Sequence, residues 1–361
     1  MRQPVSFLAL GVLLGATTVM SAGSSPGGVQ LLSAAAMRLP GAVDSNSPIV
    51  RDLVDGEGAL FVMTSFAGRP STAAGESISA MGAASPADVA PWPGGGVWME
   101  AIVEDTGTWY GYYHNEVVAT AECGATAAKM IPRIGAARSV DHGATWESLG
   151  IVLEAPPNTS ACSTKNRYFV GGVGDLSVML SPDRQDLYIF YSEYMKAPAT
   201  QGVAVARLAW ADRDDPAGKV MVWRTRTWIP ASVVTTDDGT GAWSYPAGLA
   251  IFPPTQPWHD SKASVDAFWG PSVHWNTYLN EYVMLLNRAK DESFGQEGIY
   301  VSYAPRLDDP RLWSAPVKIL NGGSWYPQVV GTGADGTDKI AGETARFFMA
   351  GQSQHVIRFS K

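Results

Sequence analysis

Three stretches of the chain repeat one pattern, and this repetition constrains the fold more than any single motif does. They read VWMEAIVEDTGTWYGYYHNE (97–116), GVGDLSVMLSPDRQDLYIFYSEY (172–194) and FWGPSVHWNTYLNEYVMLLNR (268–288). Each has a strand of small and apolar residues, a short polar turn, and a second strand rich in Tyr, Trp, Leu and Met. Repeated hairpins that each place a polar group on their first strand are typical of a β-propeller with a central site.

The pattern extends to five segments, which predict an all-β, five-bladed β-propeller. The C-terminal sequence IRFSK is a candidate strand for closing the ring, and the Gly/Ser/Ala/Pro-rich stretch 67–96 is expected to lie over one mouth of the propeller. Because the segments differ in length, a two-sheet sandwich remains the alternative. The expected order is a signal peptide (1–23), an N-terminal lead (24–43) and one propeller domain (44–361), with segments at 44–65, 97–154, 171–228, 266–320 and 325–361.

The sequence SVDHGATW (139–146) matches the Asp-box pattern S-x-D-x-G-x-T-W of sialidase-like propellers. Its physical basis is a hairpin turn in which Asp141 accepts hydrogen bonds from turn backbone, Gly143 adopts a positive φ and Trp146 packs between sheets. This motif is structural and remote from the catalytic mouth of such propellers. We therefore expect neither Asp141 nor His142 to be catalytic.

The N-terminus combines Arg2, an apolar run from Phe7 to Val19 and the small residues 21–25, as secretory signal peptides do. We expect a secreted or periplasmic monomer that has no membrane contact once the signal is cleaved. In an exported chain the only two cysteines, Cys123 and Cys162, are expected to form a disulfide. A net charge of −8 without a Lys/Arg run argues against a nucleic-acid partner.

Acidic residues on the first strands of three successive segments form the strongest candidate site: Asp44, Glu100 and Asp175. Paired carboxylates are the groups that glycoside hydrolysis needs, one as a proton donor and one as a base or nucleophile. Other polar and aromatic residues near the expected mouth suit sugar binding, because indole rings stack on sugar faces and polar side chains bond hydroxyls. The candidate substrate-binding residues are Asn46, His114, Glu116, Asp266, Trp269, His274, Trp325 and Gln328.

This arrangement resembles the five-bladed β-propeller glycoside hydrolases, such as the family 43 arabinanases and xylosidases and the family 32 fructosidases. In those families the acids lie on the first strands of blades one, two and three. The resemblance implies that Asp44 is the base or nucleophile, and that Glu100 and Asp175 are the acid and a modulator of its pKa, in either order. The match is loose, because D-S-N-S-P replaces a compact N-D-P or D-P, and Asp175 stands where those families have a Glu.

The function expected from the sequence is that of a secreted glycoside hydrolase acting on a polysaccharide or oligosaccharide. One alternative is a non-catalytic carbohydrate-binding propeller, and another is a polysaccharide lyase that uses a Tyr/His pair such as Tyr113 and His114. No cofactor is expected, and the sequence predicts no metal ligands, although propeller channels can hold a structural Ca²⁺. Convergence of Asp44, Glu100 and Asp175 on one pocket would favour hydrolysis, whereas side chains that point apart would favour simple binding.

Overall fold

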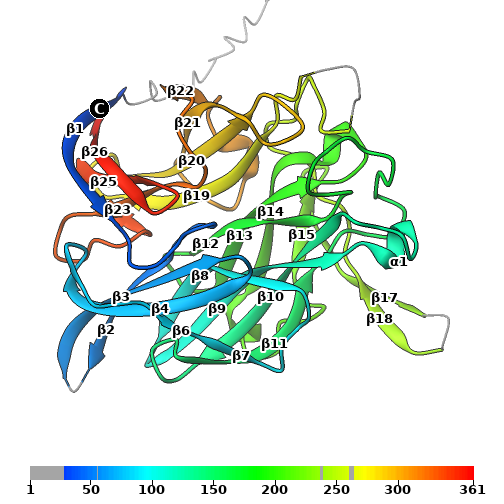
Figure 1. Cartoon of the computed structure of the whole chain (residues 1–361), viewed down its shortest axis with the longest axis horizontal. Helices are drawn as coiled ribbons and strands as arrows, with labels where there is room; N and C mark the ends of the chain where they lie inside the picture. Colours follow the sequence, from blue (N-terminus) through cyan, green and yellow to red (C-terminus); the bar gives the residue numbers. More distant parts are fainter. Residues whose placement is uncertain (1–27, 55, 236–238, 260–263) are drawn as a thin grey trace, which may run out of the picture.

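Five mainly antiparallel sheets follow one another around a central axis in the computed structural model, which describes residues 28–54, 56–235, 239–259 and 264–361 (Figure 1). The predicted five-bladed β-propeller is therefore confirmed. The expected signal peptide (1–23) lies outside the described residues. None of the helices in the described part of the chain is long and apolar enough to cross a membrane.

The first strand of each blade lies closest to the axis, and the chain then runs outward through successive hairpins. Blade 1 contains β2 (Ile49–Val54), β3 (Glu57–Phe66), β4 (Arg69–Ser77) and β5 (Ala80–Met81), and β6 (Ser85–Pro86) pairs with β4. Blade 2 contains β8 (Gly96–Asp105), β9 (Thr108–Val118), β10 (Met130–Ser139), β11 (Thr145–Leu153) and β7 (Asp88–Ala90). Blade 3 contains β12 (Val173–Leu180), β13 (Asp186–Tyr194), β14 (Gln201–Ala209), β15 (Met221–Arg224) and β16 (Thr227–Pro230).

Blades 4 and 5 complete the ring. Blade 4 contains β19 (Phe268–Asn276), β20 (Glu281–Ala289), β21 (Gln296–Ala304), β22 (Val317–Asn321) and the short β24 (Ile340–Ala341). Blade 5 contains β23 (Pro327–Gly331), β25 (Thr344–Met349), β26 (Gln352–Ser360) and β1 (Gly28–Arg38). A separate hairpin of β17 (Ser232–Thr235) and β18 (Gly241–Ser244) projects from the ring (Figure 1). The described helices are single turns: α1 (Thr120–Cys123), η1 (Pro198–Thr200), η2 (Trp210–Asp212) and η3 (Pro310–Leu312).

Two segments differ from the expectation for them. Residues 28–38 of the expected N-terminal lead form β1, which pairs with β26 along the outer edge of blade 5. The ring is thus closed by pairing of the two ends of the chain, as the IRFSK sequence predicted. The stretch 67–96 contributes β4, β5 and β6 to blade 1 and β7 to blade 2 instead of lying over a mouth. β1 and β7 pair with β26 and β11, which are not their neighbours in the sequence, so the local sequence pattern does not reveal these pairings.

Apolar side chains fill the gaps between neighbouring blades, because each sheet is covered on both faces. Examples are Val178 and Tyr191 between blades 2 and 3, and Met284 and Phe190 between blades 3 and 4. A further aromatic cluster lies at one mouth of the ring, where it brings together Phe169, Tyr194, Trp258, Trp269, Phe294 and Tyr326. This cluster forms a wall of the pocket described below.

The predicted Asp-box turn joins β10 to β11. Asp141 accepts hydrogen bonds from the Thr145 backbone N–H (2.9 Å), the Thr145 hydroxyl (2.6 Å) and the Ser139 hydroxyl (2.8 Å). Gly143 has a φ of 80°, and Trp146 is buried. The predicted disulfide between Cys123 and Cys162 is also present, and it joins α1 to the loop that precedes blade 3.

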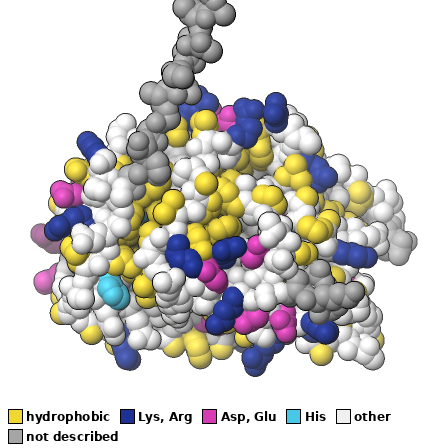
Figure 2. Space-filling view, turned by 90° about the horizontal axis from the view of Figure 1, so that it is seen from above, with side chains coloured by type: hydrophobic (Ala, Val, Ile, Leu, Met, Phe, Trp, Pro, Cys, Tyr) yellow, Lys and Arg dark blue, Asp and Glu magenta, His cyan; other side chains and the backbone are white. Residues whose placement is uncertain are grey.

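The surface carries charges of both signs. On the face in Figure 2, basic and acidic side chains alternate around a group of hydrophobic ones. Together with the net charge of −8, this distribution offers no continuous basic surface on that face.

Candidate functional site

A pocket of about 210 Å³ opens at the mouth of the propeller that the aromatic cluster surrounds. The three acids expected from the sequence, Asp44, Glu100 and Asp175, all line it. They come from the segment before β2, from β8 and from β12, so three successive blades contribute one carboxylate each. The other lining residues are Trp98, His114, Glu116, Tyr168, Phe169, Trp269, Phe294, Trp325 and Tyr326.

Irregular backbone aims several of these side chains into the pocket. The pairing of β8 with β9 shifts register between Met99 and Ala101, which is where Glu100 lies. The pairing of β12 with β13 shifts between Gly174 and Leu176, around Asp175. β-Bulges reorient side chains in this way beside active sites. Asp175 (φ 39°) and Tyr326 (φ 55°) also adopt left-handed conformations, which non-glycine residues rarely do and which concentrate at functional sites.

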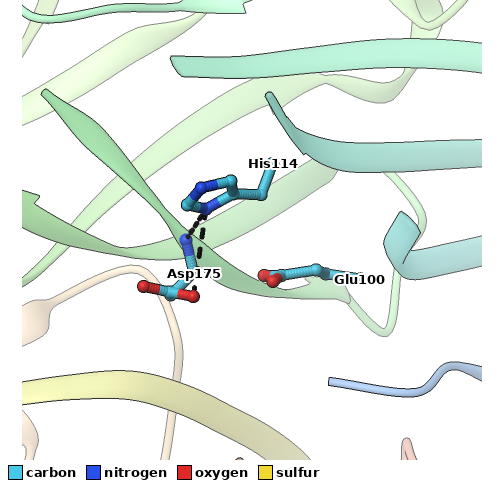
Figure 3. A group of neighbouring side chains, drawn as sticks. All are labelled: Glu100, His114 and Asp175. Carbon is cyan, nitrogen blue, oxygen red and sulfur yellow. Dashed lines mark hydrogen bonds and ion pairs between the residues drawn. The ribbon is translucent and has the colours of Figure 1, made fainter. Parts of the chain in front are cut away.

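Glu100, His114 and Asp175 form a compact group (Figure 3). One ligand atom from each lies within 4.8 Å of the other two. The Leu176 backbone N–H donates to Glu100 Oε2 (2.5 Å), and the Tyr194 hydroxyl donates to Asp175 Oδ2. Two buried carboxylates therefore share a small volume, and each already accepts at least one hydrogen bond.

Burial and mutual repulsion shift the pKa values of all three acids upward. Burial is the main cause at Asp44, followed by the charges of Asp175 and Glu116, and the pKa of Asp44 is about 6. Burial and the neighbouring Asp175 raise the pKa of Glu100 well above its usual range. Burial also raises the pKa of Asp175, but His114 and the hydrogen bond from Tyr194 oppose this. Within the close pair, Glu100 thus holds the proton more readily and Asp175 the negative charge.

His114 links the carboxylates of blades 2 and 3. The Asp175 backbone N–H donates to Nδ1 (2.8 Å), and Nε2 lies 3.1 Å from Glu116 Oε1. The first contact requires a neutral ring with its proton on Nε2. Burial disfavours the cation, but the hydrogen bond to Glu116 and the charge of Asp175 outweigh it and raise the pKa of His114 to about 9. The geometry is therefore that of the neutral ring, whereas the pKa favours the cation at neutral pH. Protonation of Nδ1 would break the contact with the Asp175 backbone, so charge at His114 and the position of Asp175 are coupled.

Aromatic rings form most of the remaining wall. Trp269 and Trp325 were expected from the sequence, and their ring centroids lie 5.6 Å apart in an edge-to-face arrangement. Tyr168, Phe169 and Phe294 were not expected, since they come from loops outside the repeated hairpins. Trp98 was not expected either, although it stands two residues before Glu100 on β8, whereas the sequence pairs Tyr326 with Trp325 as a candidate platform. Tyr168-Phe169, just before the glycine run at 171–174, was the available sequence signal.

Four of the expected sugar-binding residues lie outside this pocket. Asn46 donates through Nδ2 to the Leu176 and Pro271 carbonyls (3.0 and 2.9 Å), and Gln328 bonds the Ser47 backbone N–H and C=O (both 2.8 Å). Asp266 binds Thr255, Gln256 and Arg288. His274 is fully buried, and neither ring nitrogen has a hydrogen-bond partner among the described residues. Asn46, Gln328 and His274 are buried within the propeller scaffold. Asp266 is half-buried and contacts neighbouring residues outside the pocket.

The cluster of Glu100, His114 and Asp175 is the group of described residues that could hold a metal ion. It does not fit Ca²⁺, which prefers six to eight oxygen ligands, because it offers one nitrogen and carboxylates that already accept hydrogen bonds. A structural Ca²⁺ in the channel stays a prediction.

No model of a known protein family matches the sequence, and no curated protein does. Among solved structures, the fold is similar to that of the endo-arabinase from Bacteroides thetaiotaomicron, with a TM-score of 0.50, 9% identity, and 90% of this chain and 96% of that chain covered. The catalytic domain of a Coprinopsis cinerea GH62 α-L-arabinofuranosidase gives a TM-score of 0.48 at 10% identity, over 93% of this chain and 98% of that one. An arabinanase from Bacillus subtilis gives 0.46 at 11% identity, over 89% and 95%. The predicted resemblance is thus confirmed for the fold.

Proposed function

We propose that the protein is a secreted glycoside hydrolase that works by paired carboxylates at the propeller mouth. The observation that carries the proposal is the convergence of Asp44, Glu100 and Asp175, from three blades, on one aromatic-walled pocket. Raised pKa values of clustered acids in a cleft are characteristic of catalytic acid–base groups. The N-terminal sequence and the disulfide support secretion.

The electrostatics support distinct roles for the three acids. Glu100 is the general acid, because burial and Asp175 raise its pKa well above the usual range of a glutamate and so favour its protonated form. Asp44, with a pKa of about 6, is ionised above that pH and is the base or nucleophile. Asp175 stays the more charged partner of Glu100 and raises its pKa, which makes it a positioning and modulating residue.

The walls of the pocket support a sugar ligand. Trp98 and Trp325, backed by the buried Trp269, can pack on the apolar face of a sugar ring, and the carboxylates and His114 can bond its hydroxyls. A volume of about 210 Å³ is below the 300–1,000 Å³ that is typical of pockets for larger ligands. The pocket therefore suits one sugar unit of a longer chain.

The two rival functions make different use of these residues. A lyase that uses Tyr113 with His114 is disfavoured, because consecutive strand residues point to opposite faces. Tyr113 packs between blades 1 and 2 with its hydroxyl 3.3 Å from that of Ser148, whereas His114 faces the pocket. A binding-only propeller needs the aromatic wall but has no need for three converging carboxylates with raised pKa values.

Substitution of Asp44, the proposed base or nucleophile, and Glu100, the proposed general acid, tests the proposal. The wild-type chain is incubated with arabinan, xylan, galactan and levan, and release of reducing sugar is measured; arabinan comes first because the fold is shared with an endo-arabinase. Asp44→Asn and Glu100→Gln should each lower kcat by about 10²–10⁴-fold. Asp266→Asn is the matched control, since this carboxylate lies outside the pocket and binds Arg288. Full turnover by both pocket variants would exclude the carboxylate mechanism.

A further inference from the structure

A second and larger hollow lies on the flank of the propeller, between the end of blade 2 and the β17–β18 hairpin. Its volume is about 700 Å³, within the range typical of ligand sites. Its walls come from the ends of β9 and β10, the loop after β11, the segment after β13, and β18. We call it the flank groove. It is separate from the pocket that holds the three acids, with which it shares no lining residue.

Trp243 on β18 is held in the groove as a flat platform. An added Cβ on Gly218 would lie 2.1, 2.3 and 2.4 Å from three atoms of the indole, so one face of the ring rests directly on this glycine. Gly218 also has a φ of 76°, and its N–H donates to the Tyr245 hydroxyl (2.8 Å). Trp243 is nevertheless 43% exposed. The backbone thus fixes one face of the ring and leaves the rest of it facing the groove.

Polar groups of both signs surround this platform and have spare bonding capacity. The Glu154 carboxylate is half-buried, and among the described residues it makes no hydrogen bond or ion pair. Burial raises the pKa of Glu154. Lys196 is exposed and its ammonium is likewise without a hydrogen bond or ion pair in the described chain, whereas Arg133 is held by Asn115 and the Pro93 carbonyl. Mixed charges beside an aromatic face suit an uncharged ligand rich in hydroxyls.

The groove and the pocket open at the same end of blade 2. Consecutive residues of β9 divide between them, Glu116 lining the pocket and Val117 the groove. An extended polymer held in the groove would therefore be kept close to the mouth of the pocket. The structure provides a second holding point for a chain that the small pocket can enclose only in part.

We propose that the flank groove is a second carbohydrate-binding site, in which a neutral oligosaccharide segment stacks on Trp243 and bonds Glu154 and Lys196. The choice of a sugar as ligand rests on the proposed function. The competing occupant is a second copy of this chain, because Val233 and Val234 on the same hairpin are 63% and 42% exposed. The mixed charges of the groove favour the sugar, and the competing occupant is an outcome of the test.

The test measures retention of the full chain in native gels that contain arabinan, xylan, galactan or levan. An Asp44→Asn background prevents degradation of the polymer. Trp243→Ala should raise the apparent Kd for at least one polymer about tenfold or more, because the stacking face is lost. Trp243→Phe should lose less, since it retains a ring on the same hairpin, and Glu154→Gln should give an intermediate loss. Leu53→Ala, an apolar truncation on the exposed β2–β3 hairpin, should bind as its parent does.

Each other outcome is decisive. Equal retention of Trp243→Ala and its parent, or no retention of the parent by any of the four polymers, overturns the second site. A change in sedimentation mass on Trp243→Ala without a change in retention assigns the hairpin to self-association and also overturns it. Hydrolysis by the wild-type chain is scored separately. Retention that depends on Trp243 in a chain that releases no sugar would support this site and count against the proposed function. Sugar release by a chain whose retention does not depend on Trp243 would support the proposed function and overturn the second site.

Discussion

At the scale of single residues, the pocket is built from groups in unfavourable states. Asp175 and Tyr326 have left-handed backbones, each of which costs on the order of 1–3 kcal/mol. Tyr326 also precedes Pro327, a position that favours extended backbone. Glu100 is buried beside another carboxylate. The surrounding blades must hold these states in place, which is why they mark the site as functional rather than as ordinary core.

The pH dependence of activity follows from the shifted pKa values. Asp44 must be ionised, so kcat/KM should fall as the pH drops through about 6. Glu100 must be protonated, so activity should also fall as the pH rises through its raised pKa. Tyr194→Phe removes a hydrogen bond that lowers the pKa of Asp175. A more neutral Asp175 repels Asp44 and Glu100 less, so both limbs of the profile should move to lower pH.

Tyr191→Phe is the control for this measurement. Tyr191 is also buried and donates to a carboxylate, Glu193 (3.2 Å), but neither lines the pocket. Its pH–rate profile should match that of the wild type. Limbs that stay in place in Tyr194→Phe, or move to higher pH, would contradict the electrostatic coupling of Asp175 to the other two acids.

The sequence could predict which acids converge but not how their environment is completed. The sequence pattern assigns Asp44, Glu100 and Asp175 to first strands, where a repeat has no structural need for a varying polar group; Glu100 and Asp175 do lie on β8 and β12, whereas Asp44 lies just before β2. Tyr194, by contrast, lies at the end of a second strand, and Phe294 lies in a loop. Their approach to Asp175 and the pocket depends on packing between distant segments, for which a single sequence has no periodic signal.

At the scale of elements, local patterns were predicted well and non-local pairings were not. The hairpins of blades 2 to 4 and the Asp-box turn follow from residues adjacent in sequence. The strand β1 pairs with β26, near the other end of the sequence, and β7 pairs with β11, from which β8, β9 and β10 separate it in the sequence. The register shifts at Glu100 and Asp175 were also invisible, although they decide that both side chains reach the pocket.

The Asp-box turn should act on stability alone. Asp141→Ala removes the acceptor for Thr145 and Ser139, so the free energy of unfolding should fall by about 1–3 kcal/mol. Since the turn is remote from the pocket, kcat should be unchanged. Urea unfolding and the reducing-sugar assay measure both effects. Asp215→Ala is the control: it removes an exposed ion pair with Lys219 and should change stability by less than about 0.5 kcal/mol. A large loss of kcat in Asp141→Ala would show that the turn does influence the site.

At the scale of the whole molecule, polar residues near the axis divide into two groups by depth. Those at the mouth, such as Asp44 and Glu100, line the pocket. Those further in join blades to one another: Asn46 bonds carbonyls of blades 3 and 4, and Gln328 of blade 5 bonds Ser47 at the start of blade 1. The sequence shows that a residue belongs to a first strand, but it does not show how deep the residue lies. For this reason the sequence pattern assigns Asn46 and Gln328 to sugar binding, whereas in the structure both bond backbone groups between blades.

Asn46 connects the scaffold to the site, and its removal should affect both. Asn46→Ala leaves the Leu176 and Pro271 carbonyls without this donor, which should lower the free energy of unfolding by about 2–4 kcal/mol. Leu176 also directs its N–H to Glu100 and follows the strained Asp175, so kcat should fall with little change in KM. Urea unfolding and steady-state kinetics test this, with Asn321→Ala on the exposed edge strand β22 as the control. Wild-type stability with reduced sugar affinity would instead return Asn46 to a direct role in binding.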